Sequence, residues 1–214
     1  LKRIFDYPPL EDAPRGEIGI PRVLNMYENY PFWATFFKAL GFKVVLSPKS
    51  SHKIYELGME SIPSESECYP AKLSHGHVQW LIDNGVKTIF HPCVFYEHQE
   101  YAGAQNHYNC PIVISYPENL KNNVEAIVNG DVKYIRPFTD ENTARDRLID
   151  VCRKEWDIPE SEVANAVKLA WQEQRNAKAD IREAGKKALK WMEQNHKYGI
   201  VLAGRPYHID PEIN

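Results

Sequence analysis

The chain has 214 residues, of which 43% are hydrophobic and 26% are charged, and its formal net charge is −3. This charge gives no electrostatic support to nucleic-acid binding. No apolar run approaches the roughly 18 residues of a membrane span, so we expect neither nucleic acid nor a membrane as a partner. Four cysteines in a chain of this length are too sparse for a disulfide scaffold, which favours a reducing, cytoplasmic location.

The first half of the chain is predicted to alternate strands with helices after an irregular, proline-containing lead-in over residues 1–20. Proline is favoured in the first turn of a helix and glycine just past its end, and these two residue types mark several boundaries. The expected strands are 23–25, 43–46 and 86–90, and the expected helices are 31–40, a short one that begins after Ser50 or Ser51 and ends at Gly58, and 71–83.

The second half continues the same alternation after residues 94–109, which carry aromatic residues and histidines without a clear period. Strands are predicted at 112–115 and 132–135, and helices at 117–129 and 143–156. Strands that alternate with helices predict an α/β fold with a doubly wound, mostly parallel sheet. We assign this sheet to a domain over residues 21–158.

Residues 160–196 carry a single apolar stripe at spacings of three and four, which predicts one helix of about 50 Å. A helix longer than a small domain usually packs across a boundary, so we interpret 159–197 as a connecting helix. Residues 199–203 then have the pattern of a strand. We therefore interpret 198–214 as the start of a truncated second α/β domain, and the chain as a piece of a longer polypeptide.

Cys68 lies at the predicted start of a helix, because Pro70 fixes the first turn. Unpaired backbone N–H groups and the helix dipole lower the pKa of a thiol at such a position and favour an anionic cluster. Lys72 adds a positive charge one turn further on. These features predict a ligand of a soft metal or an iron–sulfur cluster; the alternative is a small buried residue at the helix entry.

Cys93 and Cys110 are the two other candidate ligands. Cys93 follows a buried strand at its carboxyl end, the edge at which open α/β sheets bind ligands. Cys110 precedes the predicted strand at 112–115, which places it at the opposite edge unless the loop folds back or the strand is antiparallel. The spacing excludes a zinc ribbon and fits a cluster with an open or foreign fourth ligand better. Either cysteine could instead be inert, and Cys152, inside a helical pattern, is expected in the core.

Two further polar residues are candidate cofactor-binding groups. Glu28 and Asn29 follow the first predicted strand and so occupy the usual ligand edge. By contrast, His75 and His77 lie two apart on a helix and point to different faces, which favours packing or solvation over metal binding. The sequence contains no glycine-rich P-loop and no dinucleotide fingerprint.

Five strings of residues together resemble a known family. They are Gly-Ile-Pro-Arg-Val-Leu at 19–24, Glu-Asn-Tyr-Pro-Phe-Trp at 28–33, Ser-Glu-Ser-Glu-Cys-Tyr-Pro-Ala-Lys at 64–72, His-Gly-His at 75–77 and His-Pro-Cys at 91–93. The sequence resembles the activase-related proteins of the 2-hydroxyglutaryl-CoA dehydratase system. More narrowly, it is similar to the domain that follows the ATPase part in the long members of that family, from about Gly19 to the end.

The resemblance implies an α/β domain similar to the dehydratase subunits that bind a [4Fe–4S] or related cluster through cysteines. The first two ligands of that type correspond to Cys68 and Cys93, and Cys110 matches a cysteine of the activase-related pattern. In that system the activase hydrolyses ATP to drive an electron into the dehydratase, which removes water from a 2-hydroxyacyl-CoA. The ATPase motifs are missing from this sequence, so we expect no ATP hydrolysis from it.

Three functions remain in competition. The leading hypothesis is an iron–sulfur domain for low-potential electron transfer or reductive chemistry on an acyl-CoA-like substrate, with Cys68, Cys93 and Cys110 as ligands and Lys72 stabilising the anionic cluster. The alternative is a non-catalytic interaction module whose long helix and sheet dock an ATPase (activase) domain or a dehydratase-like protein. A small-molecule-binding domain with two α/β lobes ranks third, since it gains nothing from the cysteines.

Overall fold

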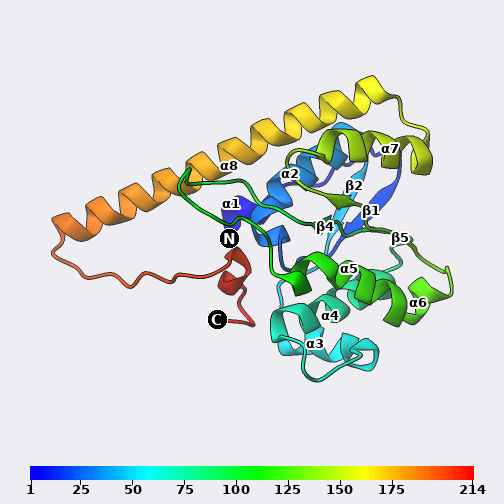
Figure 1. Cartoon of the computed structure of the whole chain (residues 1–214), viewed down its shortest axis with the longest axis horizontal. Coiled ribbons are helices and arrows are strands. Elements are labelled where there is room, and N and C mark those ends of the chain that lie inside the picture. Colours follow the sequence, from blue (N-terminus) through cyan, green and yellow to red (C-terminus); the bar gives the residue numbers. More distant parts are fainter.

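A four-stranded parallel sheet forms the centre of the structure, a computed structural model that describes residues 1–214 (Figure 1). Its strand order is β2 (Lys43–Leu46), β1 (Glu17–Ile20), β3 (Thr88–Phe90) and β5 (Lys133–Ile135). Two short strands, β4 (Cys93–Val94) and β6 (Phe138–Thr139), pair in parallel just beyond β3 and β5. The order reverses between β1 and β3, so the predicted doubly wound α/β fold is confirmed.

Helices cover both faces of this sheet, which is why its strands are apolar on both sides. One face packs against α2 (Met26–Ala39), α7 (Ala144–Trp156) and α8 (Glu160–Gln194). The other packs against α4 (Tyr69–Asp83) and α5 (Pro111–Asn123), with α3 (His52–Gly58) on the outer side of α4. The remaining elements are short: α1 (Lys2–Phe5), α6 (Glu125–Val128) and the 3-10 helices η1 (Met59–Ser61) and η2 (Pro206–Ile209). No helix is both long and apolar enough to cross a membrane.

The first strand is β1, so the predictions of an irregular lead-in over 1–20 and a strand at 23–25 are wrong. Ile18 and Ile20 are fully buried in the sheet. Gly19 between them weakens the strand signal in the sequence. The structure requires a small residue there, because a Cβ at Gly19 would lie 2.8 Å from Cγ1 of Val86.

The predicted strand at 112–115 is also wrong, because these residues form the first turns of α5. The β-branched run Ile-Val-Ile suggests a strand by propensity alone. Proline at the first helical position and buried residues at a helical spacing decide the outcome; the buried set is Val113, Tyr116, Pro117 and Leu120. Cys110 therefore begins a crossover helix, and it lies at the carboxyl edge of the sheet with Cys68 and Cys93 rather than at the opposite edge.

Helix α2 begins at Met26, five residues before the predicted start, and contains Pro31 in its interior. A proline inside a helix removes a backbone donor and weakens the hydrogen-bond ladder around it. The side-chain amide of Gln174 on α8 lies at this break: Nε2 donates to the Glu28 carbonyl (2.8 Å) and Oε1 accepts from the Phe32 N–H (3.1 Å). Gln174 thus contacts two groups that a regular helix joins directly, and it fastens α8 to α2.

The long helix is confirmed, since α8 runs from Glu160 to Gln194 and its final turns project beyond the sheet (Figure 1). The predicted strand at 199–203 is wrong, because these residues are extended, exposed and unpaired. The chain then returns to the body, and η2 packs against α2. The division into a domain over 21–158 and a truncated second one over 198–214 stays a prediction.

Replacing Gln174 with alanine should destabilise the fold by about 3 kcal/mol, because it leaves two backbone groups at the Pro31 break without a partner. Urea unfolding followed by circular dichroism measures the change. The matched control is Gln172→Ala on the exposed side of the same helix, which should stay within about 0.5 kcal/mol of the wild type. Equal effects of the two substitutions would contradict this account of α2.

Candidate functional site at the carboxyl edge of the sheet

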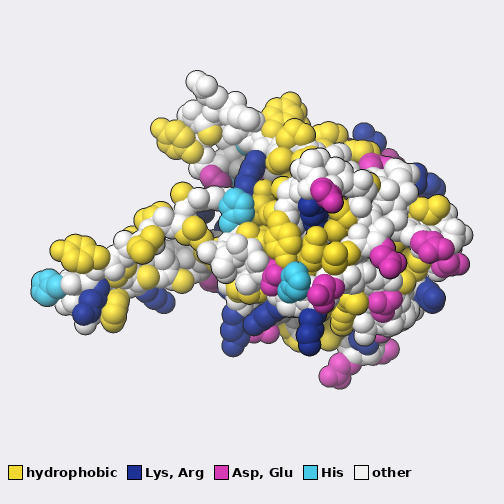
Figure 2. Space-filling view, turned by 90° about the horizontal axis from the view of Figure 1, so that it is seen from below, with side chains coloured by type: hydrophobic (Ala, Val, Ile, Leu, Met, Phe, Trp, Pro, Cys, Tyr) yellow, Lys and Arg dark blue, Asp and Glu magenta, His cyan; other side chains and the backbone are white.

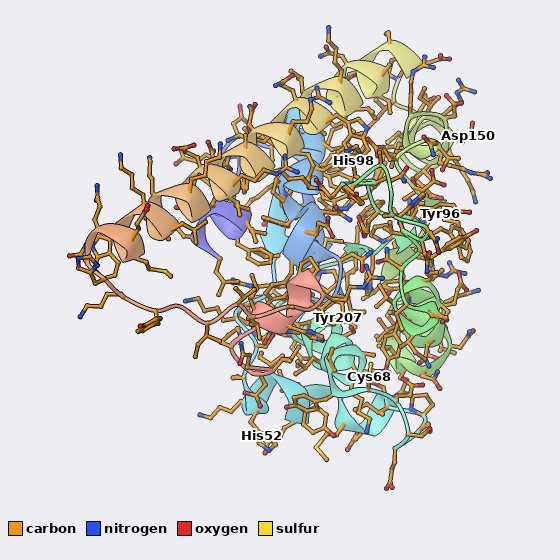
Figure 3. The ribbon with its side chains drawn as sticks, turned by 60° about the vertical axis from the view of Figure 1, so that its left-hand side comes forward. His52, Cys68, Tyr96, His98, Asp150 and Tyr207 are labelled. Atoms are coloured by element: carbon orange, nitrogen blue, oxygen red, sulfur yellow. The ribbon has the colours of Figure 1, made fainter.

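Cys68 and Cys110 occupy equivalent positions at the starts of two neighbouring helices. Cys68 is the N-cap of α4 and Cys110 the N-cap of α5, and each is followed within two residues by proline. Cys68 is exposed and Cys110 half-buried. Both thiols lie near Tyr207 of the C-terminal segment: burial first, then Cys110 and Cys68, raise the pKa of its phenol. Figure 3 labels Cys68 and Tyr207 at this edge.

Cys93 faces a different set of groups. It is fully buried, and burial, followed by the Glu118 carboxylate, raises the pKa of its thiol to about 12. The Arg136 guanidinium, which forms a 2.8 Å ion pair with Glu118, opposes this shift only in part. Cys93 is therefore a protonated thiol beneath α5. Cys152 is likewise buried in the core, as the sequence predicted.

The structure does not assemble the predicted ligand set into a metal site. No group of three His, Cys, Asp or Glu side chains is arranged to hold a metal ion. Lys72 donates from Nζ to the Glu65 carbonyl (2.7 Å), in the loop that leads to Cys68. Of the three cysteines, only Cys68 and Cys110 are accessible and share a neighbour. Iron–sulfur ligation by all three stays a prediction that this arrangement does not support.

Asn29 belongs to a cluster of amides around the carboxyl of Glu97. Oε1 of Glu97 accepts from Asn25 (2.7 Å), Asn109 (2.8 Å) and Asn29 (3.2 Å), whereas Oε2 accepts only from Asn29 (3.1 Å). Burial and the nearby Glu28 carboxylate raise the pKa of Glu97 to about 7. The cluster ties the loop after β1 to the segment after β4, at the point where the strand order reverses.

Glu28, the other predicted cofactor-binding residue, instead forms an ion pair with Lys178 of α8 (3.2 Å). Lys178 also binds Glu100 (2.7 Å), and Arg182 binds Glu100 as well. The charges of α8 therefore hold the 94–109 segment against the helix. The sequence predicts Glu28 and Asn29 at the ligand edge but carries no signal for Glu97, whose partners come from two separate segments, the start of α2 and Asn109.

The C-terminal segment places the carboxyl group of Asp210 at the carboxyl edge of the sheet. Asp210 is 2% exposed, and its Oδ2 accepts hydrogen bonds from Tyr27 and Ser50. Ser50 also contacts Nε2 of His77 (2.9 Å), and Ser47 contacts its Nδ1 (2.8 Å). Burial lowers the pKa of His77 to about 3, so this ring is neutral. Nothing in the sequence pattern marks Asp210, because the contacts join residues more than 150 positions apart.

The His75-Gly76-His77 string is explained by packing rather than metal binding. A Cβ on Gly76 would lie 1.7 Å from the Ile54 carbonyl, so only glycine allows the backbones of α3 and α4 to touch. His75 turns to the other side, where Nδ1 contacts Ser61 (2.7 Å) and Nε2 contacts Tyr116 (3.0 Å). Burial lowers the pKa of His75 to about 4, which keeps it neutral as well.

Comparison with known proteins gives one match. Residues 17–214 match the family described as CoA enzyme activase uncharacterised domain. No curated protein and no solved structure matches the chain.

The accessibility of the four cysteines predicts their order of alkylation. In native protein treated with iodoacetamide at pH 8, Cys68 should react first and Cys110 next, while the buried, high-pKa thiols of Cys93 and Cys152 should react only after unfolding. Peptide mass spectrometry after timed quenching identifies each site, and labelling in guanidinium provides the control for full reaction. Native labelling of Cys93 at the rate of Cys68 would contradict the burial of Cys93.

Proposed function

Since the chain belongs to the CoA enzyme activase uncharacterised domain family, we propose that it is a docking domain of a CoA-enzyme activase system. It binds a dehydratase-type protein through what we call the projecting end, residues 181–202, which comprises the last turns of α8 and the extended segment after it. The observation that carries this proposal is the apolar surface of that end. Its exposed large side chains are Ile181, Leu189, Trp191, Tyr198, Ile200, Val201 and Leu202.

The exposure of these side chains is unusual for a free surface. Trp191 is 56% exposed, and Ile200 is 100% exposed. Scattered apolar residues on a surface need no explanation, but seven large exposed apolar side chains concentrated on one projecting element favour a protein interface. Figure 2 shows this end extending away from the body with hydrophobic and basic side chains along it.

The backbone of the extended segment adds a second recognition element. None of the backbone groups of residues 198–204 forms a hydrogen bond with another backbone group. The sequence Tyr-Gly-Ile-Val-Leu has the composition of a strand, so the segment can pair with the open edge of a partner's sheet. Such pairing explains why residues 199–203 have the sequence pattern of a strand although they pair with no strand of this chain.

Charge indicates the chemistry of the partner's surface. Residues 181–198 contain five Lys or Arg and two Asp or Glu, whereas the whole chain has a net charge of −3. The projecting end is therefore basic on an otherwise acidic chain. It fits a partner surface with an apolar centre and an acidic rim, and the attraction should weaken as salt is raised.

Substituting the apolar residues of the projecting end should weaken binding to a 2-hydroxyacyl-CoA dehydratase by tenfold or more, because central apolar contacts carry most of the energy of an interface. Biolayer interferometry of Trp191→Asp and Ile200→Asp against the dehydratase measures this loss. The matched control is Leu169→Asp, since Leu169 is 46% exposed on the same helix but outside the projecting end.

Four results would overturn the docking proposal. The first is that the wild type does not bind the dehydratase, and the second is that Trp191→Asp and Leu169→Asp bind it equally well. Binding to the ATPase activase alone would reassign the partner. Finally, if sedimentation shows a dimer that Trp191→Asp dissociates, the occupant of this face is a second copy of the chain.

Iron–sulfur binding is a second candidate function, supported by the shared position of Cys68 and Cys110. The two cysteines are the N-caps of neighbouring helices, and the positive ends of two helix dipoles favour an anionic cluster at this position. The chain offers only this pair in accessible form, so further ligands would have to come from a partner. A [4Fe–4S] or related cluster would supply low-potential electron transfer, the chemistry that the dehydratase resemblance implies.

Anaerobic reconstitution with iron and sulfide, followed by metal, sulfide and zinc assays and a visible spectrum with and without dithionite, tests this second function. The wild type should retain iron and show a broad absorption that bleaches on reduction, and Cys68→Ser or Cys110→Ser should lose most of the iron. Cys152→Ala is the control, because this thiol is buried in the core. Full iron retention by the Cys68→Ser/Cys110→Ser double variant, zinc in place of iron, or no metal in the wild type would each overturn it.

A further inference from the structure

A relay of hydrogen bonds at the carboxyl edge of the sheet points at a single carboxylate oxygen. The Ser50 hydroxyl gives its one proton to Oδ2 of Asp210, so it accepts from Nε2 of His77 (2.9 Å). Because the buried ring of His77 is neutral, its Nδ1 then accepts from the Ser47 hydroxyl (2.8 Å). Ser47 Oγ in turn accepts from the Arg22 N–H (2.7 Å). Every donor in this relay is oriented toward Asp210.

The donors belong to the body of the domain, whereas the acceptor belongs to the C-terminal residues 205–214, which we call the strap. Tyr27 of α2 donates to the same Oδ2 of Asp210, from a position 183 residues away in the sequence. Tyr27 lies in the helix that follows β1, and Ser50 follows β2, so both are at the edge where open α/β sheets bind ligands. The body therefore forms an anion-accepting site, and the strap fills it.

Arg22, at the same edge, has no acceptor for its charged group. The residue is 7% exposed, and its guanidinium lies 3.9 Å from the ring centroid of Phe5 and 5.9 Å from that of Tyr27. Its Nε is buried without a hydrogen-bond partner, and it forms no ion pair, not even with Asp210. A guanidinium that stacks on an aromatic ring keeps its in-plane donors free, and a buried cation without an anion is costly. Arg22 thus indicates an anion that the strap does not supply.

The strap is attached to the body by polar side chains and can therefore be displaced. Its one buried residue is Asp210. Glu212 accepts from the Tyr69 hydroxyl (2.9 Å), and Arg205 donates to the Tyr108 carbonyl (2.7 Å). All of its backbone hydrogen bonds stay within it, and the extended segment that leads to it from α8 has none (Figure 1). Segments with few buried apolar contacts open at low free energy.

We infer that Arg22, Tyr27 and Ser50 form a binding site for the phosphate group of a small molecule, and that the strap occupies this site in its absence. A phosphate carries four oxygens, so it can accept from both hydroxyls and also pair with the guanidinium, which the carboxylate of Asp210 does not do. The ligand and the strap exclude each other, because each places an anion against the same hydroxyls. The strap therefore lowers the apparent affinity by the fraction of molecules in which it is closed.

Calorimetric titration of the full chain with inorganic phosphate tests this site. Asp210→Ala removes the competing carboxylate and should bind phosphate at least tenfold more tightly than the wild type, with acetate binding at least tenfold more weakly than phosphate. Adding Arg22→Met to Asp210→Ala should weaken phosphate binding tenfold or more. The matched control is Glu212→Gln, which removes one negative charge from the strap, keeps an acceptor for Tyr69 and leaves Asp210 in place, so its affinity should equal that of the wild type.

A second measurement uses the wild type alone. Tyr207 of the strap lies near the thiols of Cys110 and Cys68, so displacement of the strap should expose the half-buried Cys110. Phosphate at about 50 mM should therefore speed the iodoacetamide labelling of Cys110 at least threefold over chloride of equal ionic strength. Cys152, buried in the core, should stay unlabelled in both solutions.

Three results would overturn the inference. They are no saturable binding of phosphate to Asp210→Ala below about 20 mM, equal affinity of that variant for acetate and phosphate, and unchanged affinity when Arg22→Met is added. If Asp210→Ala does not fold, the wild type decides, because a labelling rate of Cys110 that phosphate leaves unchanged contradicts a displaceable strap. The test is independent of the docking proposal, since none of these residues belongs to the projecting end.

Discussion

The contact between Gln174 and the interrupted turn of α2 is the constraint on which the arrangement of this domain depends. Pro31 weakens the hydrogen-bond ladder of a buried helix, and one amide on α8 contacts both affected groups, the Glu28 carbonyl and the Phe32 N–H. This fixes the position of α8 along α2 to within one turn. The turns of α8 on either side of Gln174 carry Trp171 and Lys178, so the fastening also places Trp171 against Phe32 and positions the lysine that binds Glu28 and Glu100.

The half of α8 that is anchored at Gln174 determines the direction in which the projecting end is held. The half of the helix near Gln174 buries its apolar residues against α2 and α7, whereas the large apolar side chains of its last turns, Leu189 and Trp191, are exposed. A rigid helix anchored at one end presents the other end in a defined direction. The segment that follows it is extended and unpaired, and it then returns to place Asp210 among Tyr27 and Ser50. The exposed apolar stretch is therefore held at both ends by buried polar contacts.

The candidate site was visible in the sequence only where a signal is local. Cys68 before Pro70 marks a helix start whatever the rest of the chain does, and the structure has it at the N-cap of α4. Cys110 shows the limit of such reasoning. The β-branched run after it favours a strand, but in the structure these residues form α5, so Cys110 lies at the opposite edge of the sheet from the one predicted. Glu97 is a second example of this limit, because its three asparagine partners lie up to 72 positions away in the sequence.

The sequence by itself determined most of the alternation of strands and helices, the length of α8, a cap of α3 at Ser50 or Ser51 and the position of Cys68 at the start of a helix. These features depend on residues within a few positions of one another, through periodicity, proline geometry and capping. Only the tertiary structure decided which cysteines share a neighbour, that Gln174 supports Pro31, and that Glu97 and Asp210 are partnered inside the edge. Those outcomes depend on the paths of long loops and of the C-terminal segment, and a buried polar group takes whichever partner those paths bring within hydrogen-bond distance.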